Sequence, residues 1–268
     1  MSTLTLASWN VNSLKVRLPH LLAWLEKRSD IDAVVLQETK LVDEKFPFEE
    51  LAAAGWASFA YGQPTYNGVA LLGRTDRVKL DDPQLGMPGY PDEQKRYVSA
   101  TVTPLSGGDP VRFVGVYCPN GMEAGSRKYL YKLDWFRALR RALRTERSKS
   151  ARVVLAGDFN IAPADADLWN PRTWPNRILT TAPERDALSR ILREGYVDAF
   201  RAFAQPEGAF SWWDYRMAAY ERNHGLRIDL MLVSEALRPH LTSSTIDTEP
   251  RGWEKPSDHA PVVTTLRF

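Results

Sequence analysis

The sequence predicts an α/β protein in which two β-sheets pack together and helices cover the outside. Three observations lead to this fold class. Short apolar runs of strand length recur along the chain, longer segments have helical periodicity, and both kinds follow a similar order in the two halves. Neither a linker rich in proline, glycine and serine nor a low-complexity segment interrupts the sequence. We therefore expect residues 1–268 to form a single domain.

Composition excludes several classes of protein. The chain has 44% hydrophobic residues, yet no apolar run approaches the ~20 residues that cross a bilayer, so we expect no contact with a membrane. Met1-Ser2-Thr3 leads directly into a strand-like segment without a basic leader, which argues against secretion. Cys118 is the only cysteine, which excludes disulfides and cysteine-based zinc sites within the chain and fits a cytoplasmic location. A net charge of +2 neither requires nor excludes a nucleic-acid partner.

The first part of the chain is predicted to combine strands with two helices. Alternating or continuous apolar residues indicate strands at 4–9, 33–37, 57–61 and 69–73. The helix expected over 14–27 has leucines on one face, and Ser13 precedes it as a candidate N-cap. A shorter helix is expected over 46–54, and Tyr66-Asn67-Gly68 supplies the turn between the last two strands.

The middle of the chain begins with residues 81–92, which are rich in proline and glycine and are expected to form a loop. Strands at 97–104 and 111–117 alternate in polarity, and the turn residues at 106–110 indicate a hairpin. A long helix is expected over 126–147. One of its faces carries four arginines, Arg137, Arg140, Arg141 and Arg144. That basic face could be a solvated surface or a track for phosphates.

The apolar run at 153–156 leads into Gly157-Asp158-Phe159-Asn160. In an extended chain, Asp158 and Asn160 point to the same side, and Gly157 allows the backbone to approach a neighbouring group closely. A surface loop is expected over 165–180. Thr181 and Glu184 then form a capping box that opens a helix ending near Glu194. The last strands are expected at 228–233 and 262–267.

Polar groups collect at the predicted strand ends. They comprise carboxylates, amides, one phenol and one imidazole: Asn10, Asn12, Glu38, Tyr117, Asn120, Asp158, Asn160, Asp229, Asp258 and His259. Such groups suit a hard divalent cation and phosphate chemistry, because Mg²⁺ prefers carboxylates, water and substrate phosphate. No zinc cluster, P-loop, dinucleotide fingerprint or nucleophile elbow is found. A structural role stays open for single members, namely a turn at Asn12 and core packing of Tyr117.

Successive short motifs resemble the endonuclease/exonuclease/phosphatase superfamily, and within it the exonuclease III-type abasic-site endonucleases. In chain order they are Ser8-Trp9-Asn10-Val11-Asn12, Leu36-Gln37-Glu38-Thr39-Lys40, Tyr117-Cys118-Pro119-Asn120-Gly121, Gly157-Asp158-Phe159-Asn160, Arg227-Ile228-Asp229 and Ser257-Asp258-His259-Ala260-Pro261. The resemblance covers nearly the whole chain. It implies a four-layer α/β sandwich, in which helices flank two face-to-face mixed β-sheets and the active site lies at one edge.

The resemblance also implies phosphodiester hydrolysis that depends on Mg²⁺ or Mn²⁺. It implies that Glu38 is the principal metal ligand and that Asn10, Asn12 or Asp258 lies nearby. The expected partner is double-stranded DNA with abasic sites or 3′ ends, and we expect the protein to be a monomer. An enzyme of the same superfamily that cleaves RNA or a small phosphate ester is an alternative. So is a non-catalytic nucleic-acid-binding regulator on the same fold, although such a protein would be expected to lack several of the acids.

By the same resemblance, Asp158 would orient or deprotonate the attacking water, and Asn160 would hold the phosphate or that water. Asp229 would bond to His259 and favour its charged form, so that His259 could contact the scissile phosphate. Tyr117 would contact the phosphate or help the leaving oxygen. These roles are implied by the motifs, and the identity of the general base stays open.

Substrate selection is expected to involve the aromatic segment at 210–215. By resemblance, Trp212, Leu226 and Ile228 would form the wall of a pocket for an extruded abasic sugar, and Asn12 and Asn120 would contact the substrate. Leu226 replaces a tryptophan of the vertebrate-type enzyme, which puts the pocket shape and the balance of activities in doubt. Two further positions bear on DNA contact: Glu123 stands where that enzyme inserts an arginine, with Met122 beside it as a candidate wedge, and Trp213 is expected to be core.

Overall fold

The structure is a computed structural model that describes residues 2–174 and 176–268, and it contains two six-stranded sheets. The first sheet has the order β11 (Leu241–Ile246), β12 (Val262–Arg267), β1 (Thr3–Asn10), β2 (Ala33–Gln37), β4 (Val69–Arg74) and β3 (Trp56–Tyr61). The second has the order β5 (Val78–Leu85), β6 (Tyr97–Pro104), β7 (Val111–Tyr117), β8 (Val153–Asp158), β10 (Asp229–Ser234) and β9 (Tyr196–Asp198). Each sheet is mixed, because β1 pairs with β2 and β7 with β8 in parallel while the other pairs are antiparallel.

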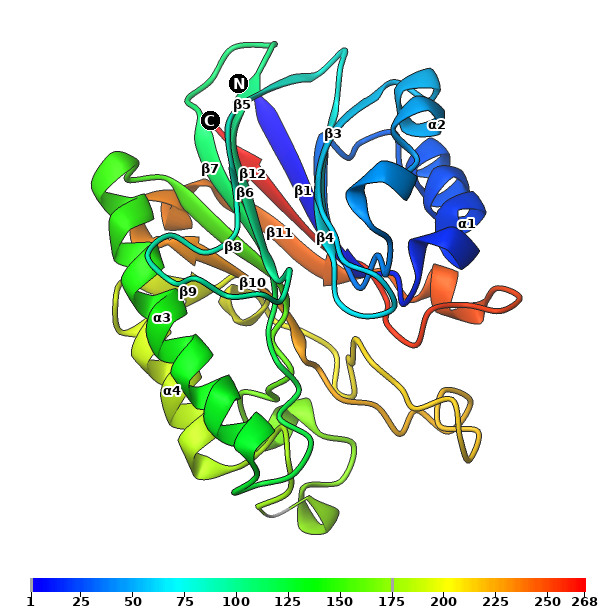
Figure 1. The fold of residues 1–268 in the computed structure, drawn as a ribbon, viewed down its shortest axis with the longest axis vertical. Coiled ribbons are helices and arrows are strands. Elements are labelled where there is room, and N and C mark those ends of the chain that lie inside the picture. Colours follow the sequence, from blue (N-terminus) through cyan, green and yellow to red (C-terminus); the bar gives the residue numbers. More distant parts are fainter. Residues whose placement is uncertain (1, 175) are drawn as a thin grey trace.

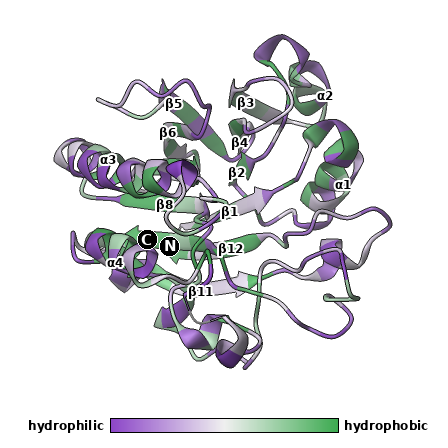
Figure 2. Cartoon of the chain, turned by 60° about the horizontal axis from the view of Figure 1, so that its bottom comes forward, coloured by the Kyte–Doolittle hydropathy of each residue, from purple (hydrophilic) through white to green (hydrophobic). Residues whose placement is uncertain are grey.

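Helices cover the outer side of each sheet. Figure 1 shows α1 (Leu14–Lys27) and α2 (Phe48–Ala53) outside the first sheet, and α3 (Arg127–Lys149) and α4 (Ala182–Leu192) outside the second. One apolar cluster lies between the two sheets, and two others lie between a sheet and its helices. Strands such as β2 and β8 are accordingly hydrophobic, whereas α3 carries many hydrophilic residues (Figure 2). The predicted four-layer sandwich is confirmed.

The predicted helices and most predicted strands are confirmed, and the exceptions lie at sheet edges. The prediction of a loop over 81–92 was wrong in its first part, because β5 extends to Leu85. β5 is an edge strand whose register shifts between Asp81 and Gln84, and an edge position tolerates Pro83 since no ladder hydrogen bond is lost there. The edge strands β9 and β11 were not predicted, because β9 is very short and β11 (LTSSTI) is largely polar.

Helix starts show one wrong prediction and one correct one. The side chain of Ser13 makes no capping hydrogen bond to α1; instead its backbone carbonyl accepts the N–H groups of Val16 and Arg17. Thr181 and Glu184 do form the predicted capping box at the start of α4.

No helix in the described part of the chain is long and apolar enough to span a membrane. Pro175, within the predicted loop 165–180, and Met1 lie outside the described residues.

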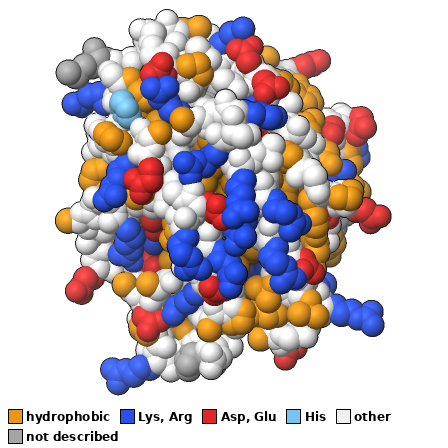
Figure 3. Space-filling model, turned by 90° about the vertical axis from the view of Figure 1, so that its left-hand side faces the viewer, with side chains coloured by type: hydrophobic (Ala, Val, Ile, Leu, Met, Phe, Trp, Pro, Cys, Tyr) orange, Lys and Arg blue, Asp and Glu red, His pale blue; other side chains and the backbone are white. Residues whose placement is uncertain are grey.

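The arginine face of α3 belongs to a basic surface that α3 and α4 form together. Figure 3 shows lysine and arginine side chains gathered on this face. Arg140 and Arg144 reach Glu194 beyond α4, and Arg137 pairs with Asp134 one turn earlier in α3. Two carboxylates thus pair with three of the four arginines, so the face keeps net positive charge, and both a solvated surface and a phosphate track stay open.

Close backbone packing brings β7 against β8 just before the polar end of β8. Gly157 has a φ of +151°, and a Cβ atom at this position would overlap the carbonyl oxygen of Val116 on β7. The predicted close approach at Gly157 is therefore confirmed. It places Asp158 directly beside Tyr117 in the parallel register.

We predict that Gly157→Ala destabilises the fold by about 3 kcal/mol, because the new methyl group must displace a strand that is packed on both sides. Urea unfolding followed by circular dichroism measures the change. Gly252→Ala is the matched control, because its nearest neighbour would be the Tyr220 hydroxyl at 3.8 Å, an ordinary contact. Equal stability of the two variants would contradict the assigned role of Gly157.

Candidate active site

The side chain of Asn10 joins the two sheets at one edge of the sandwich. Asn10 ends β1 in the first sheet, and Asp158 ends β8 in the second. The Asn10 Nδ2 group donates hydrogen bonds to Asp158 Oδ2 and to Glu38 Oε1, each at 3.0 Å. Glu38 follows β2 with a left-handed backbone (φ 52°), which turns its carboxylate toward the facing sheet. The predicted strand-end acids therefore do converge.

The side chains of Glu38, Asp158 and His259 converge at this edge of the sandwich, and the two carboxylates could hold a cation. One oxygen of each carboxylate and one imidazole nitrogen all lie within 4.8 Å of one another. Two carboxylates with a neighbouring amide suit Mg²⁺ or Mn²⁺ better than a softer metal. Lys40 Nζ lies 2.9 Å from Glu38 Oε2 and also donates to Asn12 Oδ1, so Glu38 keeps a cationic neighbour of its own.

Asp258 lies outside this group. Its carboxylate accepts hydrogen bonds from Asn12 Nδ2 at 2.9 Å and from Trp212 Nε1 at 3.0 Å. It therefore ties the aromatic segment to the loop after β1, and a role as metal ligand stays a prediction. The Asn12 amide also reaches the Tyr215 hydroxyl at 3.3 Å.

His259 and Asp229 form a buried pair, as the motifs implied. The distance from His259 Nδ1 to Asp229 Oδ2 is 2.8 Å, and Ser211 Oγ donates to the same oxygen at 2.7 Å. Burial alone would lower the pKa of His259, but the carboxylates of Asp229 and Asp158 outweigh it and raise that pKa to about 10. The imidazole is therefore charged at neutral pH, and its Nε2 faces Asp158 at 3.8 Å.

Asp158 is held in one orientation by neighbouring amides. Its Oδ1 accepts the backbone N–H of Asn160 at 2.8 Å, and its Oδ2 accepts the Asn10 and Asn160 side chains. Burial raises the pKa of Asp158 to about 7, with the charge of His259 opposing this shift and the carboxylate of Asp229 adding to it. A carboxylate whose pKa lies near neutral pH is a stronger base than an ordinary carboxylate and can assist the deprotonation of an attacking water.

Tyr117 lies next to Asp158 at the end of β7 and is half-buried. The guanidinium of Arg96 lies over its ring, 4.7 Å from the centroid. Burial and the carboxylates of Glu38 and Asp158 raise the pKa of Tyr117 well above its usual value. The hydroxyl therefore stays protonated and can donate a hydrogen bond to an anion.

Asn160 and Asn120 touch each other on the other side of Asp158. Asn120 Nδ2 donates to Asn160 Oδ1 at 3.0 Å, and Asn160 Nδ2 donates to the carbonyl of Cys118. Behind them, the fully buried Lys132 donates to the carbonyls of Asn120 at 3.0 Å and Asn160 at 2.7 Å. Lys132 also pairs with Glu184, which is buried as well. This pair holds both asparagine loops against α3 and α4.

The predicted pocket wall comes together but is closed. Trp212, Leu226 and Ile228 belong to one apolar cluster, and Trp212 pairs with Leu226 through the backbone. Leu226 is 0% exposed and Ile228 2% exposed, so only Trp212 offers surface to a ligand in this arrangement. Contact of all three with an extruded sugar stays a prediction that requires this cluster to open. Trp213 is buried and packs in the core, as expected.

Several residues around the site were not predicted. Lys40 lies in a quoted motif without a role, and Arg96, Lys132 and Ser211 were not considered. Their partners are distant in sequence, and only for Lys40 could its position two residues after Glu38 have been a signal. Met122, the candidate wedge, is exposed, with its backbone N–H bonded to Asn120 Oδ1.

Comparisons with known proteins agree with the geometry. Residues 7–259 match the Endonuclease/Exonuclease/phosphatase family. The chain is 33% identical to exodeoxyribonuclease III of Haemophilus influenzae over 267 residues, which cover 95% of this chain and 97% of the relative. It is similar to the solved structure of the 3′–5′ exonuclease (NExo) of Neisseria meningitidis, with 41% identity, a TM-score of 0.92 and coverage of 99% and 100%. An AP endonuclease from Archaeoglobus fulgidus matches at 30% identity and a TM-score of 0.91, over 99% of this chain and 100% of that one.

We predict that Lys132→Met lowers the free energy of unfolding by roughly 3–5 kcal/mol, because it leaves the Glu184 charge buried and unpaired. The double variant Lys132→Met/Glu184→Gln should recover part of this loss, since no lone charge remains. Lys128→Met, on the exposed side of the same helix, is the control and should be nearly neutral. Urea denaturation measures all three. A loss below about 1 kcal/mol in the single variant would contradict this account.

Proposed function

The chain belongs to the endonuclease/exonuclease/phosphatase family, and from this premise we propose that it is a DNA-repair phosphodiesterase. It is a metal-dependent hydrolase of the exodeoxyribonuclease III and AP endonuclease type. The observation that carries the proposal is the convergence of Glu38, Asp158 and His259, in which Asn10 joins the two carboxylates across the two sheets. We propose cleavage 5′ to abasic sites in duplex DNA, 3′–5′ exonuclease action, or both.

Glu38 is proposed as the principal holder of a Mg²⁺ or Mn²⁺ ion, with Asn10 beside it and Asp258 as a further candidate. A divalent cation at this position would supply positive charge to the phosphate of the substrate. The neighbouring Lys40 is placed to neutralise the remaining charge of Glu38. This donor set of carboxylates and an amide fits such an ion.

The chain's own residues would handle the water and the phosphate. Asp158 orients the attacking water and accepts its proton, because its carboxylate is fixed by Asn10 and Asn160 and its pKa is raised to about 7. His259, charged and held by Asp229, neutralises charge that grows on the phosphate. Tyr117 donates its hydroxyl to the phosphate or to the leaving oxygen.

The proposed partner is double-stranded DNA with abasic sites or 3′ ends, bound by a monomer. Support comes from relatives named for these activities, an exodeoxyribonuclease III and AP endonucleases. Asn12, Asn120 and Trp212 are proposed to contact that DNA, with Leu226 and Ile228 behind Trp212. We propose that residues 1–268 act as one catalytic unit. The single cysteine is consistent with a cytoplasmic location.

A metal-dependent nicking assay tests the proposal. The substrates are a duplex with one abasic site, an undamaged duplex with a recessed 3′ end, a single-stranded RNA and a phosphomonoester. We expect Mg²⁺-dependent cleavage of one or both DNA duplexes and little action on the others. Preference for RNA or the phosphomonoester would favour another enzyme of the family, and binding without any cleavage would favour a regulator.

We predict that Asp229→Asn affects activity most at alkaline pH. In the parent, the pKa of His259 is raised to about 10, so the imidazole keeps its proton throughout the neutral range. Without the Asp229 charge that pKa falls, so the variant loses the charged form at a lower pH. The ratio of variant to parent rate should therefore decrease between about pH 6 and about pH 9. A ratio independent of pH would contradict electrostatic coupling of the two residues.

We also predict that Trp212→Ala changes which DNA is cleaved. The variant should lose cleavage at an abasic site relative to exonucleolytic removal of undamaged 3′ nucleotides by roughly 10- to 200-fold, because part of an apolar wall is removed. Both activities should keep the same Mg²⁺ requirement. Their ratio is the quantity to measure, since it cancels partial unfolding. A common loss in both would show that Trp212 only supports the fold.

A further inference from the structure

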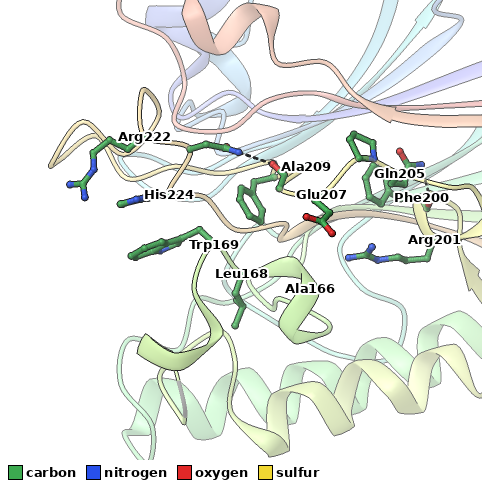
Figure 4. A pocket seen from close by; sticks show the side chains of 14 residues that line it. Ala166, Leu168, Trp169, Phe200, Arg201, Gln205, Glu207, Ala209, Arg222 and His224 are labelled. Carbon is green, nitrogen blue, oxygen red and sulfur yellow. Dashed lines mark hydrogen bonds between the residues drawn. The ribbon is translucent and has the colours of Figure 1, made fainter.

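A hollow lined by none of the candidate active-site residues takes no part in the chemistry described above. Its volume is about 700 Å³, and its walls come from the loop after β8, the segment 200–210 and the loop before β10 (Figure 4). At one end the rings of Trp169 and His224 are stacked, with centroids 3.8 Å apart and planes at 11°. Trp169 is 36% exposed, so part of its indole surface is open to a ligand.

Backbone pairing places this hollow close to the reacting groups. Trp212 pairs with His259 on one side and with Leu226 on the other, and Leu226 pairs in turn with Leu168. Trp169 follows Leu168, and its backbone N–H donates a hydrogen bond to the carbonyl of Gly225. Paired segments lie about 4.8 Å apart, so three such steps span roughly 15 Å. With a rise of about 3.4 Å per nucleotide in a stacked strand, this separation corresponds to about four to five nucleotides.

The charges in the hollow are divided between its two ends. Arg222 lies at the same end as the stacked rings (Figure 4), and its guanidinium has no carboxylate partner within the described ranges 2–174 and 176–268. Arg201, toward the other end, is already bound to the buried Asp167. Burial and the nearby Arg222 lower the pKa of His224, so the stacked pair is uncharged at neutral pH. The end with the rings thus combines an aromatic surface with one available cation.

We propose that this hollow is a subsite for an unpaired nucleotide about four to five positions away from the cleaved phosphodiester. The nucleobase stacks against the Trp169–His224 pair, and a backbone phosphate contacts Arg222. Aromatic side chains hold single-stranded nucleic acid in this way without regard to sequence, because every base has a π face. The carboxylate of Glu207 lies in the middle of the hollow, away from Arg222, which keeps the phosphate at the Arg222 end (Figure 4). This inference rests on the proposed action on DNA. It adds a DNA contact that takes no part in cleavage.

Equilibrium binding tests the subsite. A fluorescent pentathymidylate and a base-free pentamer of tetrahydrofuran phosphodiesters are titrated with the full chain in EDTA, and anisotropy is recorded. The parent should prefer the pentathymidylate. Trp169→Ala should weaken pentathymidylate binding by about 10-fold and leave the base-free pentamer unchanged, because only stacking is lost. Trp169→Phe should retain most of the preference, and Arg222→Gln should weaken both oligomers.

Phe48→Ala is the matched control, because Phe48 is also exposed and in contact with another ring, Phe46, but lies on α2. The subsite is contradicted if the parent shows no preference, or if Trp169→Ala changes both oligomers equally or neither. Cleavage of the abasic duplex, measured in parallel, should persist in Trp169→Ala. Failure of the parent to cleave any DNA would instead overturn the proposed function, so the two failures are distinguishable.

Discussion

The two hydrogen bonds of the Asn10 amide are the constraint on which the site depends. They join the end of one sheet to an acid of the facing sheet and to the acid that follows β2. Two carboxylates brought together repel each other and each loses hydration, so such an arrangement needs compensating donors. Asn10 supplies a neutral donor to both acids, and Lys40 and His259 supply positive charge from either side. With the nearby carboxylates of Asp229 and Asp258 included, the region carries net negative charge, which suits a divalent cation.

A second set of contacts lies behind the reacting groups and fixes their positions. One carboxylate oxygen of Asp229 accepts hydrogen bonds from the Ser211 hydroxyl and from His259 Nδ1. The imidazole therefore has a single orientation. On the opposite side, the buried Lys132 holds the carbonyls of Asn120 and Asn160. Buried polar groups are most stable when each is paired; Ser211 and Lys132 are paired here, whereas Asp229 Oδ1 has no hydrogen-bond partner among the described residues. The site is therefore a property of both sheets and of the helices behind them, and catalytic groups on rigid elements keep their geometry when substrate binds.

The sequence predicted those features of the fold that depend on the residues of one strand alone. Continuous apolar runs predicted central strands such as β2 and β8, because a strand that is buried on both faces carries apolar residues on both. Edge strands such as β5 and β11 were missed, because β11 is largely polar and because Pro83 indicates a loop although an edge strand tolerates it. Contacts between distant segments, such as Lys132 with Glu184, have no local signature. The closed packing of Leu226 and Ile228 likewise depends on the loop that covers them, which residue types alone do not reveal.

The central claim is that the carboxylate of Glu38 makes this edge of the sandwich a cation site. Isothermal titration of the parent and of Glu38→Gln with Mn²⁺, in the absence of DNA, tests it most directly, because the amide keeps the shape of the side chain and removes its charge. The account predicts saturable binding to the parent and at least a 10-fold weaker affinity in the variant, which corresponds to about 1.4 kcal/mol. Equal affinity in both proteins would contradict it and would place the cation elsewhere.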